Sequence, residues 1–298
     1  MASITQESSP GQTSINKASG TKGKSWLRRL SNHLFLLLGS VIFIVPLVFM
    51  VSTSLKALRQ IAQFPPELIP NPVIWLNYPD VFLYAPMHKY LLNTTYLVIP
   101  AVIGAVLTSS LAAYAFARLR APGKNFIFML LLSTMMLPSI VTMIPTYILF
   151  AKIGWIGTFL PLTVPPLAGS AFFVFLMRQF FMTIPRELEE AALIDGCSRT
   201  RIYTHIILPL AKPVLATVTI FAFIGAWNEY LGPLIYLGNK NQYTLSLGLQ
   251  VFVSSQQRQA EWGMMMAAST MMVLPIILLF FFAQKQFVQG ITLTGIKG

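Results

Sequence analysis

The residues best suited to make specific polar contacts lie in a segment, 183–209, between two long apolar stretches of the chain. Its first part crowds together the three carboxylates of Glu187, Glu189 and Glu190. Acidic groups are stabilised at the positive end of a helix dipole, Pro185 suits a first helical turn, and Thr183 can cap a helix start. This order of residues predicts a short helix with an acidic first turn.

A turn and a second helix are expected in the same segment. Gly196 should end the first helix, because glycine adopts positive φ angles at little cost. Ser198 can cap a second helix, which is expected to run to Leu208 and to stop at Pro209. The segment therefore predicts a helix, a turn and a helix.

The first of these helices is expected to show apolar side chains on two faces. At about 100° per residue, Glu190 and Leu193 point away from the other face, which holds Ile184, Leu188, Ala191, Ala192 and Asp195. A loop resting on its own membrane domain needs only one apolar face, so the second predicts docking into a partner groove, where Ala191 and Ala192 allow close approach. A helix lying on lipid is the alternative, but it would favour Lys and Arg on its polar face.

A second group of candidate residues, Trp227, Asn228, Glu229 and Tyr230, interrupts an apolar stretch. An ionisable residue inside such a stretch is a functional hypothesis, so these residues are candidates for a solute pathway. The alternative is that Glu229 reaches the lipid headgroups while Trp227 and Tyr230 anchor the chain at the membrane interface.

Other familiar chemical sites are missing from the sequence. The three histidines are scattered without metal-ligand spacing, and no GxxxxGK[ST] phosphate loop is present. Neither a Ser/His/Asp set nor a catalytic pair of carboxylates stands out, and the single Cys197 excludes an internal disulfide. The chain is therefore expected to be neither an enzyme nor a metal protein.

The elements that position these groups are long and apolar. Hydrophobic residues make up 55% of the chain and charged residues only 10%, against about 25% charged in soluble domains. Six stretches are each long enough to cross a membrane as a helix, and they lack the alternation of barrel strands: 34–55, 90–117, 125–151, 153–177, 213–239 and 262–284. The fold class predicted is an all-α membrane protein with six transmembrane helices.

Several prolines fall inside the third and fourth of these stretches. A proline leaves a backbone carbonyl that lipid cannot satisfy, so the resulting kinks must face protein or water. Broken helices build pathways in many transporters, although prolines are also common in ordinary transmembrane helices. The residues concerned are Pro138, Pro145, Pro161, Pro165 and Pro166.

The distribution of charge predicts the orientation. Residues 1–33 are polar and are expected to form a disordered cytoplasmic tail without a cleavable signal. With both termini inside, 15 of the 21 Lys and Arg residues fall on the cytoplasmic side, as the positive-inside rule requires. The net charge of +12 is therefore a topology signal, and no inference about nucleic acid or an acidic substrate is drawn from it. The partners expected of the chain include membrane lipid and no nucleic acid.

The spacing within the polar segment resembles a known motif. Glu190-Ala191-Ala192, then Gly196, then Ile206, Leu208 and Pro209 match every fixed position of EAA-x3-G-x9-I-x-LP. This is the EAA motif of the membrane subunits of bacterial ATP-binding-cassette importers. In that family the loop is a coupling helix seated in a groove of the ATPase, which implies the same role here for Glu190, Ala191, Ala192, Asp195, Gly196, Arg199, Leu208 and Pro209.

Three further segments resemble carbohydrate importers of the type of the maltose transporter's smaller permease. Trp227-Asn228-Glu229-Tyr230 is similar to their W-N-[DE]-[FY] segment, 90–94 to their Y-x-x-N-[ST], and 295–298 to their G-x-[VI]-K-G end. Thr94-Thr95 departs from the more common Ser-Leu. The resemblance covers residues 34–298, which are expected to form one type I importer permease domain that includes the 183–209 loop.

The resemblance implies a heteromeric complex of the bacterial inner membrane. Its expected partners are a second permease subunit, two ATPase subunits that use ATP and Mg, and a periplasmic or extracellular solute-binding protein; this chain would bind no cofactor. The implied mechanism is alternating access for a carbohydrate, with disaccharide, oligosaccharide, sugar acid and glycerol phosphate all open. The alternative is a stand-alone secondary transporter, but the internal repeats typical of that class are not visible.

Overall fold

The computed structural model describes residues 21–254 and 262–295. The chain forms two compact units, 1–49 and 50–298. Helix α1 (Thr21–Ser54) supplies the described part of the first unit and ends inside the second. It begins at Thr21, within the segment 1–33 expected to be disordered, and residues 1–20 of that segment lie outside the described residues.

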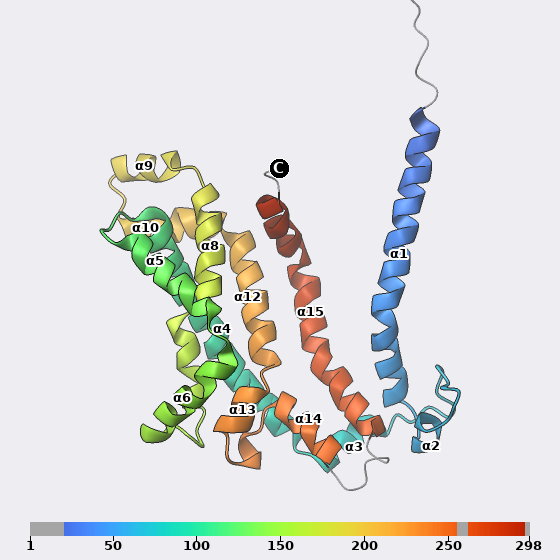
Figure 1. Ribbon diagram of the computed structural model, residues 1–298. Helices are drawn as coiled ribbons and strands as arrows, with labels where there is room; N and C mark the ends of the chain where they lie inside the picture. The colour runs from blue at the N-terminus through green and yellow to red at the C-terminus, as the bar shows by residue number, and fades with distance from the viewer. Residues whose placement is uncertain (1–20, 255–261, 296–298) are drawn as a thin grey trace, which may run out of the picture. The chain divides into compact units, whose positions relative to one another are not determined.

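The described residues of the second unit are helices and connecting turns (Figure 1). In chain order the elements are α2 (Leu58–Ile61), α3 (Asn77–Tyr84), α4 (Met87–Arg118), α5 (Lys124–Ser133), η1 (Thr134–Met136), α6 (Ser139–Lys152), α7 (Leu160–Thr163), η2 (Pro165–Ala168), α8 (Ala171–Thr183), α9 (Glu187–Ile194), α10 (Arg199–Ile202), η3 (Tyr203–Ile207), α11 (Leu208–Leu210), α12 (Lys212–Trp227), α13 (Leu231–Tyr236), η4 (Lys240–Gln242), α14 (Leu245–Ser254) and α15 (Trp262–Gly295).

The structure confirms the all-helical membrane fold, with breaks that the apolar pattern did not predict. Four helical spans among the described residues are long and apolar enough to cross a membrane: Leu30–Ser54, Met87–Arg118, Leu160–Thr183 and Trp262–Gln284. Two further pairs of helices, Lys124–Met136 with Ser139–Lys152 and Arg199–Leu210 with Lys212–Trp227, are bent by 98° and 80°. The number of spans reaches six when each bent pair counts as one.

Proline explains the break in the predicted helix 125–151. Leu137 and Pro138 have extended ψ angles of 117° and 133°, because the residue before a proline is pushed out of the helical region and proline cannot donate a backbone hydrogen bond. The predicted helix 213–239 is also interrupted: α12 ends at Trp227 and α13 begins at Leu231.

The second unit has two apolar cores, and α4 contributes to both. One core contains Ala113, Tyr114 and Ala117 of α4, with residues of α8, α12 and the 183–209 loop. The other contains Tyr90 and Val98 of α4, with residues of α3, α14 and α15. In Figure 1, α9 and α10 lie at one end of this unit and α3, α13 and α14 at the other. Helix α4 thus runs from the 183–209 loop to the opposite end.

Candidate functional site: the 183–209 loop and a cavity beside helix α4

The 183–209 loop has the helix, turn and helix that its sequence predicts. Helix α9 ends at Ile194, and Gly196 follows with a φ of +77°. The Ser198 side chain then accepts a hydrogen bond from the Arg201 backbone N–H at 3.3 Å and caps α10. The turn and the second cap are therefore where the residue types place them.

Two boundaries of the loop differ from the prediction. Thr183 is the last residue of α8, where its hydroxyl donates to the Phe180 carbonyl at 2.7 Å, and Arg186 occupies the start of α9. The second helical segment continues past Pro209 to Leu210. A π-helical turn, η3, immediately precedes α11, so Pro209 lies near the end of the continuous helical segment Arg199–Leu210, which ends one residue after the proline.

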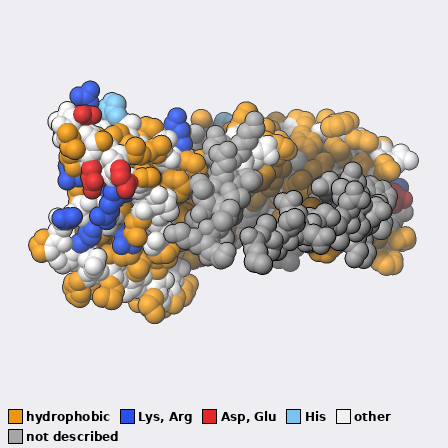
Figure 2. All heavy atoms as spheres, turned by 90° about the horizontal axis from the view of Figure 1, so that it is seen from above, with side chains coloured by type: hydrophobic (Ala, Val, Ile, Leu, Met, Phe, Trp, Pro, Cys, Tyr) orange, Lys and Arg blue, Asp and Glu red, His pale blue; other side chains and the backbone are white. Residues whose placement is uncertain are grey.

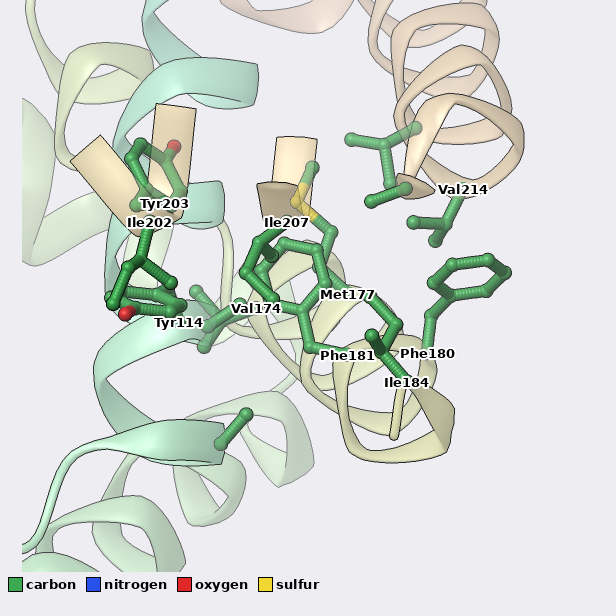
Figure 3. Packing of buried hydrophobic residues seen from close by; sticks show 14 of the residues in the cluster. Tyr114, Val174, Met177, Phe180, Phe181, Ile184, Ile202, Tyr203, Ile207 and Val214 are labelled. Carbon is green, nitrogen blue, oxygen red and sulfur yellow. The ribbon is translucent and has the colours of Figure 1, made fainter. Parts of the chain in front are cut away.

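The buried side of the loop packs on the protein's own transmembrane helices. Figure 3 shows Ile202, Tyr203 and Ile207 of the loop against Tyr114 of α4 and Met177 of α8. Ala192 joins the same core, and Leu208 packs partly buried against it. The second half of the loop therefore carries most of the apolar contact that fixes it to the membrane domain.

The opposite side of the loop remains exposed. Leu188 is 45% exposed and Ile194 is 87% exposed, and Ala191 is exposed although Ala192 is buried. Ile184 precedes α9 and is buried, so the predicted common face is divided between the two sides. Figure 2 shows acidic and basic side chains among hydrophobic ones at this end of the unit. The exposed charged residues of α9 and of the turn and helix that follow it are Glu187, Glu190, Asp195, Arg199 and Arg201. Gly196 and Pro209 are exposed as well.

A buried ion pair of the loop was not predicted from the sequence; its two atoms lie within ion-pair distance but without hydrogen-bond geometry. The Arg118 Nε lies 3.1 Å from the Glu189 Oε1, and the two side chains are only 2% and 7% exposed. Arg118 also donates hydrogen bonds from Nη2 to the carbonyls of Phe181 and Ile184 at the end of α8. One guanidinium therefore joins α4, α8 and α9. The three neighbouring glutamates were the feature of the sequence that could have indicated an ion pair, but they did not show which carboxylate is buried.

A second polar contact joins α4 to the other half of the loop. The hydroxyls of Ser110 and Tyr203 are 2.6 Å apart in a buried setting. The rings of Tyr114 and Tyr203 pack beside them with centroids 5.1 Å apart. Both halves of the 183–209 loop are thus attached to the last two turns of α4 and the residues just before them.

A cavity of about 670 Å³ lies beside α4, nearer its other end. Helix α4 contributes Thr94, Leu97, Ala101 and Ala105 to the wall, and the rest comes from α6, from 161–173 and from 221–244. Three of the prolines singled out above line it, namely Pro161, Pro165 and Pro166. At 1.5 Å per residue, Ala105 and Arg118 are about 20 Å apart along α4.

The segment 227–230 contributes one residue to this cavity. Glu229 is among the lining residues, whereas Trp227, Asn228 and Tyr230 are not. Trp227 is buried and donates from Nε1 to the Met272 carbonyl at 3.0 Å, and the Asn228 side chain donates to the carbonyl of Ile224. Tyr230 donates to the Gln250 side chain at 2.7 Å. Glu229 is therefore the one member of this group that lines the cavity.

The packing of α4 beside the cavity is close. The backbone N–H of Ser170 donates to the Ser109 Oγ at 3.1 Å. A Cβ added to Gly169, whose φ is +84°, would lie 2.9 Å from the Thr108 Oγ1. A Cβ on Gly104 would lie 2.3 Å from the Leu167 side chain. Helix α4 is thus packed tightly against the segment that forms one wall of the cavity.

Known proteins share this sequence pattern. Residues 104–293 match the family model described as binding-protein-dependent transport system inner membrane component. The chain is 35% identical over 266 residues to the sn-glycerol-3-phosphate transport system permease protein UgpE of Yersinia enterocolitica, covering 87% of this chain and 94% of that protein. It is 31% identical over 235 residues to the diacetylchitobiose uptake system permease protein NgcG of Streptomyces coelicolor, covering 78% of each.

The fold also matches solved structures. A chain of a bacterial ABC transporter involved in the import of the acidic polysaccharide alginate superposes with a TM-score of 0.78 at 22% identity, covering 92% of this chain and 100% of that one. The family match spans more than half of the sequence. The chain belongs to the binding-protein-dependent transport system inner membrane components, and it is a multi-pass, non-catalytic permease subunit of a bacterial ATP-binding-cassette importer.

Proposed function

We propose that this chain forms, with a second permease subunit, an alternating-access pathway for a carbohydrate delivered by a solute-binding protein. In this proposal the 183–209 loop transmits closure of the partner ATPase subunits to the membrane domain. The observation that carries the proposal is that one helix, α4, both holds the loop through Arg118 and Ser110 and lines the cavity with Thr94 to Ala105.

The exposed side of α9 supports the docking part of the proposal. Leu188, Ala191 and Ile194 present apolar surface while the other side of the helix already packs on this subunit. An amphipathic helix of this kind commonly seats its free apolar side in a groove of a partner. Glu190, Asp195 and Arg199 are exposed in α9 and in the residues that follow it, and charged groups at the rim of an interface give orientation and specificity.

The buried ion pair supports the transmission part. Moving α9 without α4 would separate Arg118 from Glu189, and breaking a buried pair costs about 3–5 kcal/mol. A movement of α9, the end of α8 and α4 as one rigid body keeps the ion pair intact and therefore has the lower free-energy cost. ATP binding by the partner then shifts a two-state equilibrium, and this subunit supplies the element with two arrangements.

The cavity supports the pathway part. It is concave, mostly apolar and walled by proline-broken segments, which is typical of ligand sites in transporters. The relatives named for glycerol phosphate and diacetylchitobiose uptake are consistent with a carbohydrate or a related polyol as solute.

The coupling role is tested with Arg118→Ala and Glu189→Gln in the purified complex. Both variants should retain the copurifying ATPase and its basal hydrolysis but lose most of the stimulation by loaded binding protein, together with uptake into proteoliposomes. Arg120→Ala is the matched control, because Arg120 is exposed two residues away. Wild-type stimulation and uptake in both variants would refute the proposal, and so would the absence of any copurifying ATPase, which would favour a stand-alone transporter.

A further inference from the structure

We infer that the cavity is a charge filter in which Glu229 favours a neutral, polyhydroxylated solute over phosphates and sugar acids. The inference rests on the proposed pathway and narrows it to one class of solute. Its strongest support is the charge of the wall: among the described residues that line the cavity, Glu229 is the only one that is Asp, Glu, Lys, Arg or His. The wall formed by this subunit therefore offers an anion no opposite charge.

The carboxylate of Glu229 is fixed between two helices. Glu229 lies two residues after the end of α12 at Trp227 and two residues before the start of α13 at Leu231. The Glu229 Oε1 accepts the Gly232 N–H at 2.8 Å, and the Ser246 hydroxyl donates to the Glu229 carbonyl. The carboxylate is thus held in place, and it already uses a backbone N–H that would otherwise suit an anionic ligand.

The hydroxyl groups on α6 point to the same class of solute. Ser139, Thr142 and Thr146 line the cavity at spacings of three and four residues, which places them on one helix face. The Thr142 hydroxyl donates to the Ser139 carbonyl at 3.0 Å, and the Thr146 hydroxyl donates to the Thr142 carbonyl at 2.7 Å. Since these protons are engaged, both threonines present acceptor oxygens to the cavity.

Part of the cavity wall therefore offers hydrogen-bond acceptors, and it offers no cationic donor for an anion. The Thr94 hydroxyl is already engaged within the protein, because it donates to the Tyr90 carbonyl and accepts the Leu245 N–H. A neutral sugar supplies O–H donors to such acceptors, and its apolar ring faces can lie against Phe173 and Tyr236 of the same cavity. A phosphate or carboxylate has oxygens that only accept, so burying it here would leave charge uncompensated.

The substrates named for the similar proteins include both anionic and neutral molecules. Glycerol 3-phosphate and the acidic alginate, named for two of the similar proteins, are anionic, whereas diacetylchitobiose is neutral. The cavity of this chain suits the neutral class.

The electrostatic potential inside the cavity is measured with charged thiol reagents on the purified complex in nanodiscs. Thr142→Cys in a Cys197→Ser background places one thiol of this chain in the cavity. Cationic trimethylammonioethyl methanethiosulfonate should react faster than the anionic sulfonatoethyl reagent by about tenfold, after each rate is normalised to that with a small free thiol. Glu229→Gln should abolish most of this ratio, whereas Glu229→Asp, which keeps the charge, should preserve it.

The second arm measures uptake by the complete importer with its binding protein. A neutral disaccharide should be taken up faster, and should stimulate ATP hydrolysis more, than glycerol 3-phosphate or a diuronate. Equal reaction of the two reagents, a ratio unchanged by Glu229→Gln, or uptake of either anion as fast as the best neutral sugar would each overturn the inference. The reagent ratio does not depend on docking of the ATPase, so failure of the coupling proposal remains distinguishable from failure of the charge filter.

Discussion

The two ends of α4 use polar groups in opposite ways. At the loop end, Arg118 and Glu189 are buried and paired with each other, and Ser110 is paired with Tyr203. At the cavity end, Glu229 and the α6 hydroxyls line the cavity, and the hydroxyl protons of Thr142 and Thr146 are engaged by backbone carbonyls. Polar groups that are buried and paired with each other suit a rigid connection between helices that must transmit movement. Polar groups that line a cavity suit a wall that must bind a solute weakly and release it.

The largest expected effect comes from removing one member of the buried pair. Arg118→Met alone should destabilise the subunit by about 3–5 kcal/mol, because Glu189 is left buried without its partner. Arg118→Met with Glu189→Leu should recover most of that loss, since apolar packing often replaces a buried ion pair at little cost. Thermal unfolding of the purified complex measures both, and a double variant no more stable than the single one would contradict this account.

Gly196→Ala should have the next largest effect. The residue has a φ of +77°, and a Cβ there would meet no atom within 4 Å, so the cost is conformational, about 1–2 kcal/mol. Gly238→Ala is the matched control, since its Cβ also meets nothing within 4 Å and its φ is not positive. Stimulated ATP hydrolysis should fall for Gly196→Ala alone, and equal effects of the two variants would show that the turn is not required.

Tyr203→Phe tests the second contact between α4 and the loop. It removes the hydroxyl that lies 2.6 Å from Ser110 and keeps the ring packed beside Tyr114. The expected loss of stability is about 1 kcal/mol, with a partial loss of coupling. Ser110→Ala should lose a similar amount, and the double variant should add little, because both remove the same contact. Additive losses would indicate that the two hydroxyls act separately.

Glu190→Lys should change stability least, although it reverses a charge. Glu190 is exposed, unlike Glu189, and a cation in the first turn of a helix costs about 0.3–1 kcal/mol. Stimulated hydrolysis should nevertheless fall, because the exposed side of α9 is the proposed contact with the ATPase. Destabilisation as large as that of the Arg118 variants would place Glu190 in the buried connection instead.

The sequence predicted the local structure of the loop better than its attachment. The turn at Gly196 and the cap at Ser198 depend on single residues with strong conformational preferences, so they could be predicted. The pairing of Arg118 with Glu189 joins residues 71 positions apart in the chain, and three neighbouring glutamates are chemically equivalent until the helix is placed. Tertiary packing determines which of the three glutamates is buried beside Arg118, and a helical projection of the sequence contains no information on that packing.

For the membrane helices too, the sequence predicted the type of structure but not its tertiary arrangement. Apolar length was sufficient to predict an all-α membrane fold, but it did not predict that the stretch 125–151 bends by 98° near Pro138. Proline within apolar sequence can kink a helix slightly or break it, depending on what surrounds it. Likewise, the composition of 227–230 did not show that Trp227 faces the core while Glu229 lines the cavity. The segment 295–298 lies almost wholly outside the described residues.

The central claim is that the 183–209 loop and α4 move together. Spin labels at Cys197 in the loop and at Leu111→Cys, an exposed position on α4, report that distance by pulsed electron paramagnetic resonance. A second pair, Leu111→Cys with Ile148→Cys on α6 in a Cys197→Ser background, reports the distance between α4 and α6, two helices that contribute to the cavity wall. On addition of ATP and Mg to the complete importer, the first distance should stay constant while the second changes. A first distance that changes by about one helical turn, 5.4 Å, while the second stays constant would contradict the claim.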